Sequence, residues 1–280
     1  MDLLDVTKYL VCTKCRNDVH WFSDKGECTA CGAIYNIKND IVDMRSEKQS
    51  EPELYKNKSY KKLAKVLNNV QENHYREGSA SEKLERKFKN SLISLIDGQT
   101  DLVVDIGCGT GSSFRALEKF KCIIGVEFDM RLLEKARKDF PKARLVCCDI
   151  SQSPFRSGVF STVTSMASLE HIFWLDSTLS NLEKMLKPDG KLYAMVPNEG
   201  GLAWSTARYL FTMRTNAKMS DLLPSEFIEA VKISHCNTIY SLDSALHKFF
   251  TFEKIKYWPF NFGGVNVNLV TSYRLAKLNF

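Results

Sequence analysis

Residues 102–111 read LVVDIGCGTG, and this stretch decides the fold class of the chain. A short apolar run containing one acid leads directly into three glycines, Gly107, Gly109 and Gly111, with the spacing G-x-G-x-G. Glycine is needed where a backbone turns tightly or approaches a ligand closely, so the pattern indicates a buried strand followed by a ligand-binding loop. A dinucleotide-binding loop would instead have the spacing G-x-G-x-x-G, which argues against a dehydrogenase.

Short apolar runs alternate with amphipathic segments after this loop, which is typical of a doubly wound α/β fold with a parallel sheet. The further strand-like runs are residues 122–128, 143–150, 160–169 and 190–197, and the helical segments are residues 112–120, 130–140 and 175–186. Two last strand-like runs, 250–258 and 267–278, have no helical pattern between them. They predict a hairpin that closes the sheet.

Three blocks organise the chain. Residues 1–45 form a compact, cysteine-punctuated unit with short β-like runs. Residues 46–98 predict a linker and two helices, because apolar residues recur at helical spacing over 63–70 and over 84–96. Residues 99–280 then form the α/β domain, and the stretch at about 199–248 departs from its rhythm and predicts a substrate-binding or lid insertion.

From residue 101 to 197 the chain resembles the class I S-adenosylmethionine-dependent methyltransferases, in particular type 11-like members. The similarity rests on Asp105 before the glycine loop, GVEFD at 125–129, CCDI at 147–150, FSTVTSMASLEHI at 160–172 and LKPDGKLYAMVP at 186–197. It implies a Rossmann-like seven-stranded sheet with helices on both faces, and S-adenosyl-L-methionine as cofactor. The cofactor-binding residues that it implies are Asp105, Gly107, Gly109, Gly111, Glu127, Phe128, Asp149, Ile150 and Ser168.

The resemblance also implies roles for three of these residues. Glu127 stands where the family places an acid that accepts both ribose hydroxyls, which two carboxylate oxygens suit well. Phe128 stands where an apolar side chain lies against the adenine, and Asp149 where an acid receives the adenine amino group. Taken singly, each acid could equally be a turn cap or a surface charge, so it is their joint occurrence that carries the interpretation.

His171, just after the fourth strand of the α/β domain, is the candidate general base, because its ordinary pKa suits proton transfer near neutrality. The alternative is that His171 shapes the pocket without transferring a proton. The stretch SLEHIFW at 168–174 lacks the Asn-Pro-Pro-aromatic motif of enzymes that methylate the amino groups of adenine or glutamine. Cys147 and Cys148 likewise have no adjacent proline, which excludes the nucleophile motif of 5-methylcytosine enzymes.

The segment after the fifth strand predicts the acceptor site. Its candidate substrate residues are Glu199, Trp204, Arg208, His235 and Asn237. Hydrogen-bonding side chains with a tryptophan suit a saccharide or another small molecule, as in surface-polysaccharide or secondary-metabolite biosynthesis. Alternatively, the aromatic residues belong to the core of a helical lid. Two other hypotheses stay open: an RNA or translation-factor methyltransferase that docks through its N-terminal unit, and a binding scaffold without activity.

Cys12, Cys15, Cys28 and Cys31 form two Cys-x-x-Cys pairs separated by twelve residues. Two such knuckles supply the four thiolates of a tetrahedral zinc site, whereas a redox dithiol needs only one pair. The block resembles the zinc ribbon of the activator family of tRNA and protein methyltransferases. With no fifth ligand position in the pattern, we expect the Zn²⁺ to be structural.

Charge and composition narrow the partners. The chain has 280 residues and a net charge of +6, yet residues 1–50 hold seven basic and eight acidic side chains, so the cysteine unit is not a basic patch. This disfavours an RNA or protein partner docked by charge and favours a small-molecule or saccharide substrate. No apolar run is long enough to span a membrane, and the N-terminus lacks a secretory pattern. The chain has nine cysteines, an odd total, and those outside the two pairs are scattered along it. This suits a reducing compartment rather than a disulfide framework, so we expect a cytoplasmic protein.

Overall fold

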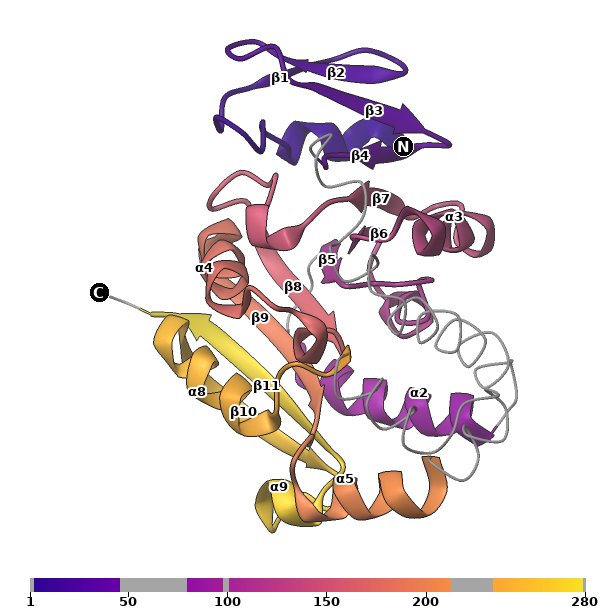
Figure 1. The fold of residues 1–280 in the computed structure, drawn as a ribbon, viewed down its shortest axis with the longest axis vertical. Helices are drawn as coiled ribbons and strands as arrows, with labels where there is room; N and C mark the ends of the chain where they lie inside the picture. The colour runs from indigo at the N-terminus through magenta and orange to yellow at the C-terminus, as the bar shows by residue number, and fades with distance from the viewer. Residues whose placement is uncertain (1–2, 46–79, 98–100, 213–233, 279–280) are drawn as a thin grey trace.

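The computed structural model describes residues 3–45, 80–97, 101–212 and 234–278. The helix predicted over 63–70 lies outside these residues. Within them, one sheet runs through the whole molecule with the strand order β1-β2-β3-β4-β7-β6-β5-β8-β9-β11-β10 (Figure 1). No helix among the described residues is long and apolar enough to cross a membrane.

The predicted seven-stranded methyltransferase sheet is confirmed. Its strands are β7 (Arg144–Cys147), β6 (Cys122–Glu127), β5 (Leu102–Ile106), β8 (Phe160–Met166), β9 (Leu186–Pro197), β11 (Val270–Lys277) and β10 (Phe250–Trp258). The first five pair in parallel, while β11 runs antiparallel between β9 and β10. The predicted C-terminal hairpin is therefore present, and a four-residue helix, α9 (Gly264–Val267), lies in its connection.

Helices cover both faces of the sheet, as Figure 1 shows. The helices α4 (Leu175–Met185) and α8 (Ile239–Phe249) pack on one core, which takes alternate side chains of the strands such as Val104. The helices α2 (Ala80–Ile93) and α3 (Met130–Asp139) share the opposite core with side chains such as Val103. Alternate strand residues point to opposite faces, so strands buried on both faces read as continuous apolar runs.

One predicted helix is much shorter than the sequence indicates. Residues 112–120 form only a four-residue 3-10 turn, η4 (Phe114–Leu117), and no α-helix follows the glycine loop directly. The loop is held tightly from both ends, because the Ser113 hydroxyl donates to buried Asp105 and the Phe114 amide donates to the Gly111 carbonyl. The prediction of a helix over residues 112–120 is therefore wrong in both its length and its type.

The N-terminal unit is built from strands β1 (Val19–Trp21), β2 (Lys25–Cys28), β3 (Ile34–Lys38) and β4 (Ile41–Asp43), after a 3-10 turn, η1 (Leu3–Tyr9). We call residues 3–45 the ribbon. The strands β1 to β4 form an antiparallel meander. Its last strand, β4, then pairs in parallel with β7, so the ribbon extends the methyltransferase sheet rather than standing beside it (Figure 1).

The predicted insertion at about 199–248 is described in two parts. Its first part is α5 (Leu202–Ala207) followed by the π-helical turn η7 (Arg208–Thr212). Its last part is most of α8, whose apolar face packs with α4 on the sheet. This last part therefore contributes to the helical layer of the fold, while residues 213–233 lie outside the described chain.

Candidate active site and metal centre

The glycine loop leaves β5 at Ile106 with backbone angles that favour glycine. Gly107, Gly109 and Gly111 have φ values of +70°, +54° and +80°, in the left-handed region. A Cβ added at Gly107 would lie 2.3 Å from the Cβ of Ser168, so this glycine permits the close approach of the loop after β8. A Cβ at Gly109 would meet no atom within 4 Å, so the backbone there faces open space and can be approached by a ligand.

Asp105 lies inside the fold beneath this loop. Its carboxylate accepts hydrogen bonds from the hydroxyls of Ser113 and Thr164, the latter at 2.8 Å, and only 1% of the residue is exposed. Burial raises the pKa of Asp105 to about 6. The two hydroxyl donors favour the charged form and therefore act to lower this pKa, but burial outweighs them. In this arrangement Asp105 holds the glycine loop in shape.

Glu127 is the last residue of β6, and its side chain links this strand to the glycine loop. Its Oε2 accepts the Gly109 amide at 3.1 Å, and its Oε1 accepts the amides of Phe128 and Asp129 at 2.7 and 3.0 Å. Burial raises the pKa of Glu127, and these three amide donors oppose that shift. A carboxylate offers about four acceptor positions, so three amide bonds leave capacity for a ligand hydroxyl.

Asp149 and Ile150 follow β7 and are both half-buried. The Asp149 carboxylate caps the short turn η5 (Ile150–Gln152) by accepting the Ser151 amide at 2.9 Å. The Asn181 side chain from α4 donates to the carbonyls of Ile150 and Ser151 at 3.2 and 2.8 Å, which holds the turn on the sheet edge. β5, β6 and β7 are parallel neighbours, so the residues after their carboxyl ends lie along one edge.

Ser168 follows β8 at the same edge. Its hydroxyl lies 2.6 Å from that of Ser165 and donates to the Ile106 carbonyl at 2.9 Å. The residue before Ser168, Ala167, has a φ of +55°, a left-handed backbone that is uncommon for a residue with a Cβ. Such backbone strain is concentrated at functional sites, where surrounding contacts hold it in place.

The 3-10 turn η6 (Leu169–His171) brings two titratable side chains to this edge. The Nδ1 of His171 lies 2.7 Å from the Ser234 carbonyl, so Nδ1 carries the proton and Nε2 is the basic nitrogen. Partial desolvation lowers the pKa of His171, although 43% of its side chain stays exposed.

Sequence reasoning missed Glu170, the residue before His171. Its side chain is 2% exposed, its Oε2 has no hydrogen-bond partner, and its Oε1 lies 3.9 Å from the His171 Nε2. Burial raises the pKa of Glu170 to about 7. A charged residue inside the LEH stretch was visible in the sequence, but its burial was not.

The structure brings four of the candidate substrate residues into one network, centred on Glu199. The Glu199 carboxylate accepts from Trp204 Nε1 at 2.9 Å and from Arg208 Nη1 at 2.6 Å, and it lies 3.1 Å from His235 Nδ1. These interactions lower the pKa of Glu199 although burial opposes them. The His235 ring in turn stands edge-on to His171 at a centroid distance of 4.6 Å, which places the network beside the candidate base.

Asn237, the fifth candidate substrate residue, makes its hydrogen bonds to the η6 turn. Its side-chain amide donates to the carbonyls of Leu169 and Ile172 at 3.0 and 2.7 Å, and its backbone amide donates to the Glu170 carbonyl at 3.1 Å. All of these contacts tie the η6 turn to the start of α8. Asn237 therefore positions the loop that carries His171, and its direct contact with a substrate stays a prediction.

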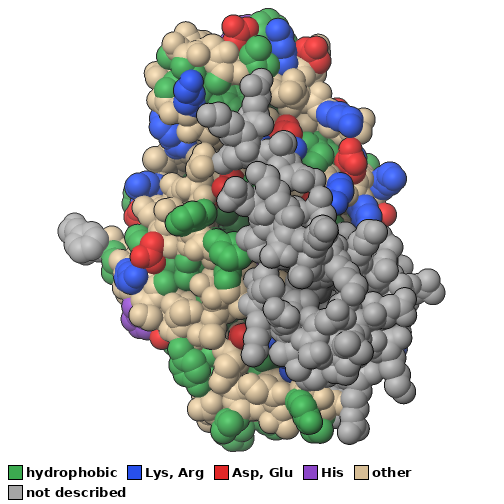
Figure 2. Space-filling view, viewed as in Figure 1, with side chains coloured by type: hydrophobic (Ala, Val, Ile, Leu, Met, Phe, Trp, Pro, Cys, Tyr) green, Lys and Arg blue, Asp and Glu red, His purple; other side chains and the backbone are tan. Residues whose placement is uncertain are grey.

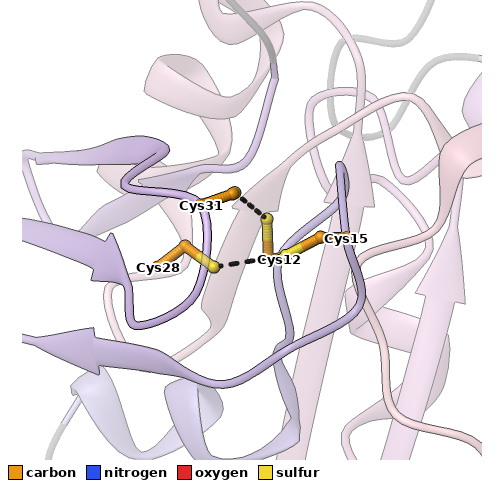
Figure 3. A group of neighbouring side chains, drawn as sticks. All are labelled: Cys12, Cys15, Cys28 and Cys31. Atoms are coloured by element: carbon orange, nitrogen blue, oxygen red, sulfur yellow. Dashed lines mark hydrogen bonds between the residues drawn. The ribbon is translucent and has the colours of Figure 1, made fainter.

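The four predicted metal ligands converge within the ribbon, and Figure 3 shows their side chains pointing toward one another. All four sulfur atoms lie within 4.8 Å of one another, with Cys12 to Cys31 at 3.6 Å and Cys15 to Cys28 at 3.4 Å. Zinc–sulfur bonds of about 2.3 Å in a tetrahedron require sulfur separations of about 3.8 Å, so the cluster fits one ion with little adjustment.

The knuckles are built alike. The residue after the second cysteine of each pair, Arg16 or Gly32, has a positive φ of 64° or 68°. Its amide donates to the carbonyl of the first cysteine, Cys12 or Cys28, at 2.9 or 3.1 Å. The Tyr35 hydroxyl donates to the Cys12 sulfur at 3.1 Å, a contact that stabilises a metal-bound thiolate from outside the ligand set.

Comparisons with known proteins agree with this fold. Residues 104–194 match the family described as "Methyltransferase domain". The biotin biosynthesis bifunctional protein BioHC of Saccharophagus degradans is 31% identical over 114 residues, covering 39% of this chain and 20% of that protein. The ubiquinone biosynthesis O-methyltransferase of Coxiella burnetii is 30% identical over 127 residues, covering 44% and 52%. The chain thus spans about half or less of these curated relatives.

Among solved structures, the N-methyltransferase NodS of Bradyrhizobium japonicum, in complex with S-adenosyl-L-homocysteine, is similar to this chain with a TM-score of 0.54. The two sequences are 14% identical, and the match covers 80% of this chain and all of NodS. At this identity the likeness concerns the fold alone.

Proposed function

Because residues 104–194 match the methyltransferase domain family, we propose that the chain is an S-adenosylmethionine-dependent methyltransferase that acts on a small-molecule or saccharide acceptor. One observation carries the proposal. The base candidate His171 lies beside the polar Glu199 network, and its amide donates to the carbonyl of Ser168, which packs against Gly107 of the glycine loop. Cofactor and acceptor would therefore meet at one edge of the sheet.

The residues at this edge fit the cofactor. Gly109 leaves open backbone, Glu127 retains acceptor capacity for a ribose hydroxyl, and half-buried Phe128 would lie against the adenine. Asp149 and Ile150 would complete the adenine side. The bound cofactor supplies an electrophilic methyl group on a sulfonium, so the protein has to orient the acceptor and remove its proton.

His171 would take that proton. The Ser234 carbonyl fixes its tautomer with Nε2 unprotonated, and its lowered pKa keeps the ring neutral at pH 7. The cofactor, when bound, would supply the methyl carbon: the acceptor atom would bond to it, the bond from that carbon to sulfur would break, and its electron pair would stay on sulfur. The acceptor proton moves to Nε2, where the Glu170 carboxyl 3.9 Å away would stabilise the imidazolium.

The ribbon argues for a small acceptor rather than RNA. Figure 2 shows acidic and basic side chains intermixed over the visible face of the ribbon, with no basic field. Nucleic-acid binding needs concentrated Lys and Arg, because phosphate contacts supply most of the affinity. We also propose that the four cysteines hold a structural Zn²⁺, since no position is left open for a substrate.

Two measurements test this function. Calorimetry should detect binding of S-adenosylhomocysteine, and the absence of binding would exclude the enzyme. Labelled S-adenosylmethionine should then transfer its methyl group to a sugar-nucleotide or metabolite pool, whereas label found in tRNA or rRNA alone would contradict a small acceptor.

A variant tests the base. His171→Gln should lower the turnover number by about 10²- to 10⁴-fold without changing S-adenosylhomocysteine affinity. An unchanged turnover number would assign His171 to shaping the pocket only. His247→Gln is the matched control, since His247 is an exposed residue of α8.

A further inference from the structure

Two of the segments of the methyltransferase domain that the ribbon contacts lie on the side where the adenine is proposed to bind. One follows β6 and contains Phe128, and the other follows β7 and runs from Asp149 to Phe155. Two arginines of the ribbon, Arg45 and Arg16, make these contacts from different directions.

Arg45 lies at the end of the ribbon, just beyond β4. Asp43 holds its guanidinium through bonds of 2.9 and 2.7 Å, and only 15% of the side chain is exposed. The guanidinium lies over the Phe128 ring at 5.7 Å and donates to the Phe128 carbonyl at 3.4 Å. Pairing of Asp43 with Cys147, reinforced by the bond from the Met44 amide to the Cys147 carbonyl, fixes this arrangement in register with β7.

Arg16 belongs to the first cysteine knuckle. Its left-handed backbone and its amide bond to Cys12 are parts of the turn that presents Cys12 and Cys15 to a metal. Its guanidinium reaches across to the segment after β7, where it donates to the carbonyls of Ser153 and Phe155, the latter at 2.6 Å. The conformation of the metal knuckle therefore determines where Arg16 can hold this segment.

We propose that the metal-bound ribbon sets the affinity for the adenosine part of the cofactor, with Arg16 and Arg45 as positioning residues. Arg45 fixes Phe128 through its contacts with the ring and the carbonyl of that residue. Arg16 fixes the segment that begins at Asp149 through its bonds to the carbonyls of Ser153 and Phe155. The proposal rests on the proposed function, because it assumes that this edge binds S-adenosylmethionine. A Cys₄-bound ion contributes by fixing the knuckle that orients Arg16.

Calorimetry on the full chain loaded with zinc tests the proposal, with S-adenosylhomocysteine and adenosine as probes. The variants are Arg16→Ala and Arg45→Ala, which keep all four cysteines. The control is Lys14→Ala. Lys14 is an exposed residue of the same knuckle, and its replacement by alanine removes a positive charge just as the arginine variants do. Zinc content is measured for each protein, so a loss of metal is distinguished from a loss of the arginine contact.

We expect each arginine variant to raise the Kd of both probes about tenfold, the size of effect that loss of one hydrogen bond from a charged group gives, with zinc content and the Lys14→Ala affinity unchanged. Hydrogen exchange should become faster in residues 127–129 for Arg45→Ala and in residues 149–155 for Arg16→Ala. Unchanged affinity in both arginine variants, or an equal loss in Lys14→Ala, would overturn the proposal. Failure of the unmodified protein to bind S-adenosylhomocysteine would instead overturn the proposed function.

Discussion

Replacing Glu170 by glutamine should remove a pH-dependent cost of folding. Glu170 is 2% exposed, and its Oε2 has no hydrogen-bond partner, so ionisation inside the fold is unfavourable. Burial raises its pKa from the model-compound value of 4.5 to about 7. Glutamine has nearly the same shape as the protonated acid but cannot ionise.

The sign follows from proton binding. Between pH 4.5 and about 7 the folded chain keeps a proton on Glu170 that the unfolded chain releases, so the free energy of unfolding falls as pH rises through this window. A pKa difference of about 2.5 units corresponds to about 3 kcal/mol at 1.36 kcal/mol per unit. We therefore expect Glu170→Gln to match the unmodified protein near pH 4.5 and to be more stable by about 3 kcal/mol above pH 8.

Urea unfolding followed by circular dichroism from pH 4.5 to 8.5 measures this difference. Asp105 has no interaction with Glu170 and cancels in the difference, whereas His235 does not cancel, because the Glu170 charge acts to raise the pKa of His235. Glu118→Gln, at an exposed position, is the control and should give a flat difference. A pH-independent difference for Glu170→Gln would refute the reasoning, because it would mean that the Glu170 carboxyl titrates alike in the folded and unfolded chains.

Two further predictions concern the loop and the metal centre. Gly107→Ala should cost about 3 kcal/mol of unfolding free energy, because it adds left-handed strain and a contact of 2.3 Å with Ser168. Gly158→Ala shares the strain, with a φ of +68°, but meets no atom within 4 Å, so its urea midpoint should fall less, and equal losses would contradict the packing argument. Tyr35→Phe removes the donor to the Cys12 sulfur and should weaken zinc affinity 10- to 100-fold in chelator competition; unchanged affinity would show that this donor is irrelevant to the metal.

Local patterns in the sequence were sufficient to predict the glycine loop, the strands of the α/β domain and the cysteine cluster. The spacing of Gly107, Gly109 and Gly111 predicted the loop, apolar runs predicted the strands, and the Cys-x-x-Cys pairs predicted a four-sulfur cluster, because each depends on residues close together in the chain. The contacts among the candidate substrate residues were harder to predict, because Glu199 and His235 meet only after the chain returns to the same edge of the sheet. Their identity was visible in the sequence, but their mutual contact was not.

Tertiary structure decided what the sequence could not express. Burial, with the charge of Glu199, raises the pKa of Glu170. A loop held at both ends shortens the expected helix after Gly111 to a 3-10 turn. The ribbon reads as an independent metal unit in the sequence. Yet β4 pairs with β7, and Arg16 reaches Ser153 across 137 residues. Pairing and burial of this kind depend on where distant segments come to lie, a property that local composition and spacing do not encode.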